Sequence, residues 1–142
     1  MFNSDIAARG ELSDSPLRRL LRVSRTHRLH PGLVLVGILR LDPQFVLDLR
    51  WPAVDTSAGW IQQGEELVGL PSAVSQLLEW HAARQRLDRT RSLSWLGTDH
   101  VLVDQGGWHY DLESADAAMG FFCAQIGLPA IPFATLRHPC LG

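Results

Sequence analysis

The stretch Leu33–Trp51 reads LVLVGILRLDPQFVLDLRW and is the longest apolar run of the 142-residue chain. Its first part, 33–41, is apolar on both faces almost to its end, which is typical of a central strand covered on both sides. Its second part, 45–51, has apolar side chains at every second position, which is typical of a half-buried strand. Asp42-Pro43 between them suits a type I turn. The stretch therefore predicts a buried β-hairpin against which helices pack.

Helical and strand patterns flank this hairpin. Helices are expected from Pro16 to about 29, after Pro71-Ser72 to about 88, and over 115–126 behind a Ser114 cap. Shorter strands are expected at 65–70, 92–96, 100–104 and 107–112. The sequence thus predicts an α+β fold, an antiparallel sheet of about five to six strands with three helices in the order α-ββ(β)-α-βββ-α. Residues 1–12 are expected to form a flexible N-terminal tail and 13–142 a single domain.

The composition is that of an ordinary globular domain, with 46% hydrophobic and 20% charged residues and a net charge of −2. Every apolar run is far shorter than the roughly 20 residues that cross a bilayer. The N-terminus lacks the hydrophobic stretch of a signal peptide. Cys123 and Cys140 give neither a disulfide framework nor a zinc-binding spacing. We therefore expect a cytoplasmic protein without a membrane partner.

All 13 cationic residues are arginine, and the chain contains no lysine. Schiff-base, pyridoxal-phosphate and phosphate-loop mechanisms all use a lysine amine, so this chain supplies none of them. The motifs GxSxG, HExxH, CxxC and GxGxxG are also absent. These absences favour a non-catalytic protein over an enzyme, and we expect no cofactor.

The charge is unevenly distributed, since residues 16–30 carry five arginines and no acid while 92–142 carry five acids and one arginine. Four arginines lie opposite the apolar side of the first expected helix: Arg18, Arg19, Arg22 and Arg25. Within the helix, no acid lies three or four residues away to neutralise them. Such a stripe suits a solvated face, an acidic protein partner or nucleic-acid phosphates. The overall acidity and the lack of an aromatic among these arginines argue against nucleic acid.

Two histidines and two aspartates are expected on one face of the hairpin 100–112: His100, Asp104, His109 and Asp111. A Gln105-Gly106 turn would set His100 opposite Asp111, and a Gly106-Gly107 turn would set Asp104 opposite His109. The four residues could form a general acid–base pair, or His100, His109 and Asp111 could bind a metal ion. Cross-strand polar pairs on a solvated face are the simpler interpretation.

Other polar groups have structural explanations. His27 and His30 have a spacing that suits a metal ion, but Pro31 interrupts the helix there, and His27 is more simply a cation at a helix C-terminus. His81 lies in the middle of an apolar helical stripe and is expected to be a core histidine with a backbone partner. Cys123 is expected to be a small core residue.

The sequence favours a small protein-binding module of the immunity, chaperone or adaptor type. It would recognise a protein partner through the basic helix and through surface aromatics such as Trp60. The predicted element order resembles the α-βββ-α-ββ-α layout of type III secretion chaperones, a resemblance of fold alone. Two alternatives remain: a small metal-dependent or His/Asp acid–base enzyme, and a nucleic-acid-binding regulator acting through the basic helix. A homodimer is compatible with all three.

Overall fold

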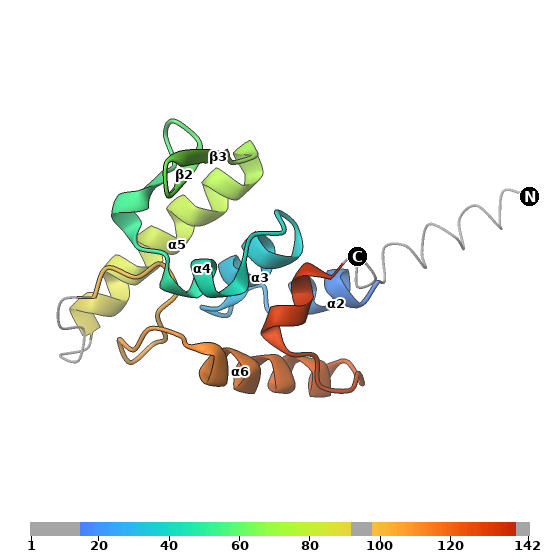
Figure 1. Ribbon diagram of the computed structural model, residues 1–142. Helices are drawn as coiled ribbons and strands as arrows, with labels where there is room; N and C mark the ends of the chain where they lie inside the picture. The colour runs from blue at the N-terminus through green and yellow to red at the C-terminus, as the bar shows by residue number, and fades with distance from the viewer. Residues whose placement is uncertain (1–14, 92–97, 139–142) are drawn as a thin grey trace, which may run out of the picture.

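The computed structural model describes residues 15–91 and 98–138. These residues form five α-helices, two 3-10 helices and three strands, shown in Figure 1. In chain order these are α2 (Pro16–Val23), α3 (His30–Gly37), α4 (Pro43–Asp48), η1 (Trp51–Ala53), β1 (Val54–Asp55), β2 (Trp60–Gln63), β3 (Glu66–Gly69), α5 (Ser72–Arg91), α6 (Leu112–Gln125) and η2 (Phe133–Arg137).

The stretch Leu33–Trp51 forms two helices and a 3-10 turn, so the predicted β-hairpin is wrong. Every residue of α3 is buried, and a short apolar run fits a buried helix as well as a central strand. Asp42 and Pro43 begin α4 instead of making a turn. The Asp42 carboxylate accepts a hydrogen bond from the Phe45 amide at 3.0 Å, and Pro43 occupies the first turn of the helix.

Helix α3 is the centre of the hydrophobic core, and it contacts α2, α4, α5 and η2. Figure 1 shows α3 between α5, α2 and α6. Two glycines allow this close packing. A Cβ atom at Gly32 would lie 2.7 Å from Leu102 Cδ1, and one at Gly37 would lie 2.6 Å from Leu17 Cδ1. The core is therefore organised around a helix.

The sheet has three antiparallel strands in the order β1-β2-β3, not the five to six strands predicted. Trp60 pairs with Asp55 on one side and with Gly69 on the other. The prediction of a strand within 65–70 is confirmed by β3. Residues 52–64, for which no strand was predicted, contain β1 and β2. This small sheet lies at one end of the molecule, beside the start of α5 (Figure 1).

The three helices predicted from the sequence are present with different ends. Helix α2 is capped by Ser15 and stops at Val23, well before the expected end near 29. Helix α5 extends to Arg91. Helix α6 begins three residues earlier than predicted because Asp111 caps it, accepting the Ser114 amide at 2.8 Å while Ser114 completes a capping box.

The hairpin expected over 100–112 is reduced to single bridges. Val103 pairs with His109 across the five residues 104–108, so both predicted registers are wrong. Asp104 shapes this turn because its carboxylate accepts the amides of Gly106 and Trp108 at 2.9 and 3.0 Å. Trp108, at the end of this turn, is 72% exposed. The strand predicted at 92–96 and the tail predicted at 1–12 lie outside the described residues.

Taken together, the described residues form a mixed α+β fold with more helix and less sheet than predicted. Across residues 15–91 and 98–138, every helix is too short or too polar to cross a membrane.

Candidate nucleic-acid interface

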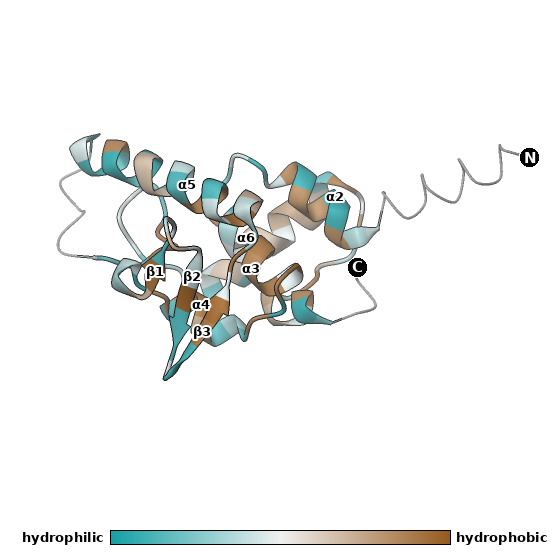
Figure 2. Ribbon diagram, turned by 90° about the horizontal axis from the view of Figure 1, so that it is seen from above, coloured by the Kyte–Doolittle hydropathy of each residue, from teal (hydrophilic) through white to brown (hydrophobic). Residues whose placement is uncertain are grey.

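Two arginine-rich segments of the chain lie against each other. Residues 15–30, which contain α2, carry five of the thirteen arginines, and residues 80–91, the second half of α5, carry four more. Asp88 is the one acid within these two segments. Figure 2 shows α5 and α2 along the same edge of the molecule. Their charges therefore add on one side of the fold.

Hydrogen bonds fix the two segments to each other. The Arg84 guanidinium on α5 donates to the carbonyl oxygens of Thr26 and His27 in the turn after α2. Arg28 of the same turn makes a two-pronged ion pair with Asp88, with both N–O distances at 2.8 Å. This geometry is favourable for a guanidinium and a carboxylate. The turn after α2 is thereby held on α5.

We call the surface formed by five arginines of these segments the basic face: Arg22, Arg25, Arg28, Arg84 and Arg91. Arg22, Arg25 and Arg91 are exposed, while Arg28 and Arg84 are half-buried. Two carboxylates reduce the net positive charge of the basic face. Asp88 is paired with Arg28. The hydrogen bond that Arg28 donates to Asp88 raises the pKa of Arg28, and the charge of Asp104 adds a smaller effect in the same direction.

An aromatic ring lies within the basic face. The Arg84 guanidinium carbon is 4.6 Å from the centre of the Trp80 ring, in a cation–π arrangement. Trp80 nevertheless remains 51% exposed. The sequence argument against nucleic acid, that no aromatic accompanies the arginines of the first helix, therefore does not hold for the folded chain.

The predicted partner-binding residues divide between several places. Arg22 and Arg25 lie in the basic face. Arg19 is half-buried and donates to the Ile126 carbonyl at 2.5 Å, so it binds the C-terminal end of α6. Arg18 is exposed and lines a groove with Arg40. Trp60 is half-buried in β2, at the sheet end of the molecule.

Sequence reasoning missed the arginines that α5 contributes. Arg84 and Arg91 stand in the charged end of the second predicted helix, RQRLDRTR, but nothing in the sequence shows that this helix packs beside the first. The excess of arginine over acid in 84–91 is the one signal that could have linked the two segments.

The histidines near the basic face are neutral at pH 7. His27 stacks edge-on against Phe122, and burial followed by the charges of Arg28 and Arg84 lowers its pKa. It is therefore not the helix-terminal cation that was expected. His30 lies 3.0 Å from Ser24 Oγ, and burial lowers its pKa to about 4. The prediction that His81 is a core histidine is confirmed, because it is fully buried with Nε2 2.7 Å from the Val101 carbonyl oxygen.

Of the four polar residues predicted to share a face of the hairpin 100–112, only the two histidines lie against each other. His100 and His109 stack with ring centroids 4.3 Å apart, and burial, then the charges of His109 and Arg50, lowers the pKa of His100. Asp104 holds the turn, and Asp111 caps α6, where hydrogen bonds from Ser114 lower its pKa. Within the described ranges no three histidine, cysteine, aspartate or glutamate residues gather in a group that could hold a metal ion.

The sequence matches no family model and no curated protein. Among solved structures, the fold is similar to a chain described as the crystal structure of XerA recombinase, with a TM-score of 0.61 and 16% sequence identity. The similarity covers 88% of this chain and 45% of that chain, so the present sequence spans less than half of its length. At this level of identity the likeness establishes a shared fold.

Proposed function

We propose that this chain is a nucleic-acid-binding domain that holds phosphate groups on the basic face. The observation that carries the proposal is the joining of two arginine-rich segments, remote in sequence, into one surface through Arg84 and the Arg28–Asp88 pair. Guanidinium groups bind phosphates with good geometry, so the exposed Arg22, Arg25 and Arg91 on one side of a small domain suit a polyanion.

The fold supports the same proposal. XerA is a recombinase by its description, and recombinases act on DNA, so the shared fold is compatible with a nucleic-acid partner. The overall charge of −2 argues weakly against it, because charge segregation matters more than the sum. The acids of the described chain lie mainly outside the two arginine-rich segments.

The test measures binding of a labelled 20-base-pair duplex by fluorescence anisotropy at several salt concentrations. We expect affinity that falls steeply with salt, with a logarithmic slope of about −0.9 for each phosphate contacted. The double change Arg25→Gln and Arg91→Gln should weaken binding and flatten the slope by about 1.8 if each arginine makes one contact. Arg137→Gln is the control, since Arg137 is exposed outside the basic face. Salt-independent binding, or failure to bind both this duplex and a single strand of the same length, would refute the proposal.

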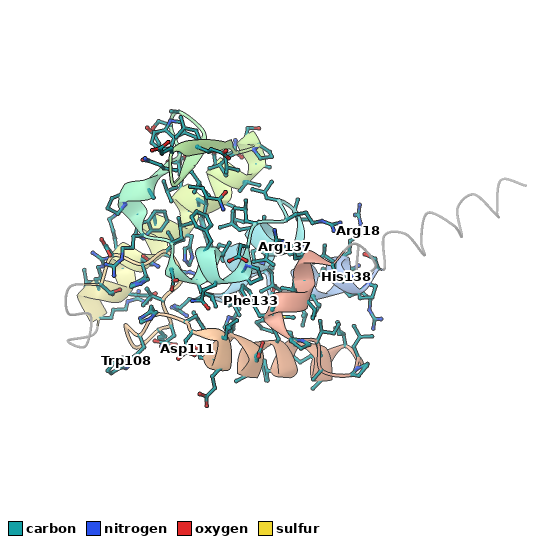
Figure 3. All side chains as sticks on the ribbon, in the orientation of Figure 1. Arg18, Trp108, Asp111, Phe133, Arg137 and His138 are labelled. Carbon is teal, nitrogen blue, oxygen red and sulfur yellow. The ribbon has the colours of Figure 1, made fainter. Side chains whose placement is uncertain are left out.

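Recognition of a protein is the second candidate, and two exposed aromatic side chains favour it. Trp108 on the second hairpin is 72% exposed and points away from the body in Figure 3, and Phe121 on α6 is 59% exposed. Exposed aromatics are frequent anchors in protein interfaces. Binding of a protein that is lost on Trp108→Ala and Phe121→Ala, but not on the arginine changes, would favour this candidate.

A further inference from the structure

An alternating stripe of apolar and cationic side chains runs along α5 at the border of the basic face. It consists of Trp80, Arg84, Leu87 and Arg91. Their spacing of four, three and four residues places them on one side of the helix. Eleven residues of α-helix span about 16 Å, so the stripe is long enough to contact several units of a polymer.

The two apolar members of this stripe are exposed although neither is needed to close the core. Trp80 is 51% exposed and Leu87 is 56% exposed. Each is followed by an arginine on the same side, Arg84 after Trp80 and Arg91 after Leu87. A surface that repeats an apolar group and then a cation matches a polymer that repeats an apolar ring and then a phosphate.

The Trp80 ring is held in place before any partner arrives. Arg84 packs over it at 4.6 Å and is itself fixed by the carbonyl oxygens of Thr26 and His27. A ring on a 20-residue helix, braced by an anchored guanidinium, loses little freedom when another ring stacks on it. The arrangement is therefore a preformed stacking platform.

From this geometry we infer that the basic face takes unpaired nucleotides in preference to a duplex, with a base stacked on Trp80 and phosphates on the exposed Arg91 and Arg25. The inference rests on the proposed nucleic-acid function. In a duplex the flat faces of the bases are covered by their neighbours, whereas an unpaired base offers its face to an aromatic side chain. Aromatic platforms interleaved with cations are the usual means of binding single strands.

The experiment compares labelled twelve-nucleotide strands of thymidine and of uridine with a twelve-base-pair duplex, by anisotropy at fixed salt. We expect one or both single strands to bind more tightly than the duplex, and the two strands to show whether DNA or RNA is preferred. Trp80→Ala should weaken single-strand binding by roughly tenfold or more, the effect of losing a base–aromatic stack, and should leave duplex binding unchanged. Trp80→Phe should retain most of the affinity.

Two further measurements separate stacking from a structural role. Stacking on Trp80 quenches its fluorescence, so a bound strand should quench the parent protein and quench Trp80→Phe clearly less. Trp108→Ala is the matched control, since Trp108 is more exposed and lies outside the stripe, and it should bind as the parent does. The thermal midpoints of all variants should agree within a few degrees because both side chains are exposed.

Each alternative outcome overturns a defined statement. A duplex bound as tightly as the single strands, or equal loss of both on Trp80→Ala, overturns the single-strand inference and leaves the nucleic-acid proposal standing. Failure to bind any of the three probes overturns the proposed function and the inference together. Equal competition by poly-glutamate, which carries charge but no bases, shows that the stripe selects an acidic polypeptide and also overturns the inference.

Discussion

His81 shows how a single buried side chain makes stability depend on pH. Its ring is fully buried, and Nε2 donates a hydrogen bond to the Val101 carbonyl oxygen at 2.7 Å. The other ring nitrogen lies 3.4 Å from the Arg84 guanidinium, so a proton added there would bring two positive charges together. Burial lowers the pKa of His81 to about 4, and His30 behaves in the same way.

These lowered pKa values predict acid destabilisation well above the range of carboxylates. Between pH 6.5 and about 4 the unfolded chain takes up protons that the folded chain does not. The free energy of unfolding should therefore be constant above pH 6.5 and fall below it, by about 1.4 kcal/mol per pH unit for each histidine. Urea titrations at pH 7.0 and 5.0 measure this. His81→Gln should reduce the slope, and an unchanged slope for this variant would contradict the assignment.

Asp88 provides a second prediction at the residue scale. It is 5% exposed and accepts both hydrogen bonds of Arg28, which lower its pKa. Asp88→Asn removes a negative charge from the basic face and leaves Arg28 without its carboxylate. We expect stability to fall by about 1–3 kcal/mol while affinity for nucleic acid rises and the salt slope steepens by up to about 0.9. Glu65→Gln, exposed in the turn between β2 and β3, should change neither quantity.

At the scale of elements, the errors of sequence reasoning concentrate in short segments. Helices α5 and α6 were predicted because their apolar stripes recur over many residues. Helices α3 and α4 have eight and six residues, which is too few for the helical repeat of apolar residues to be recognised. In addition, α3 is apolar on all sides. The dipeptide Asp42-Pro43 suits a type I turn and the N-terminus of a helix equally well. The packing of other elements on both sides of α3 decides whether this stretch forms a hairpin or two helices.

Two helical glycines give a matched test of this packing. A Cβ atom at Gly32 of α3 would meet Leu102 at 2.7 Å and Phe133 at 3.3 Å, whereas one at Gly120 of α6 would meet nothing within 4 Å. Gly32→Ala should lower the free energy of unfolding by about 1–3 kcal/mol through overpacking. Gly120→Ala should raise it by about 0.5–1 kcal/mol because alanine favours the helix. Chemical denaturation of both variants checks the pair, and equal effects would show that α3 is not tightly enclosed.

At the scale of the whole molecule, the sequence predicted the part of the candidate interface that α2 contributes, but not the part that α5 contributes. The arginines of α2 were visible in sequence because they stand together without acids. Arg84, Arg91 and Trp80 joined them only through the docking of α5, a contact between positions some 60 residues apart. Local patterns carry no information about such contacts, and therefore the sequence could not supply the aromatic that the argument for nucleic acid needed.

The basic face has a consequence for how the protein can be regulated. All its cations are guanidinium groups, and the chain holds no amine side chain for an acetyltransferase or a ubiquitin ligase to modify. Methylation of arginine keeps the positive charge. Lysine acetylation and lysine ubiquitination therefore cannot change the charge of this face. Competing anions or removal of the partner are the routes of release that remain compatible with these modifications.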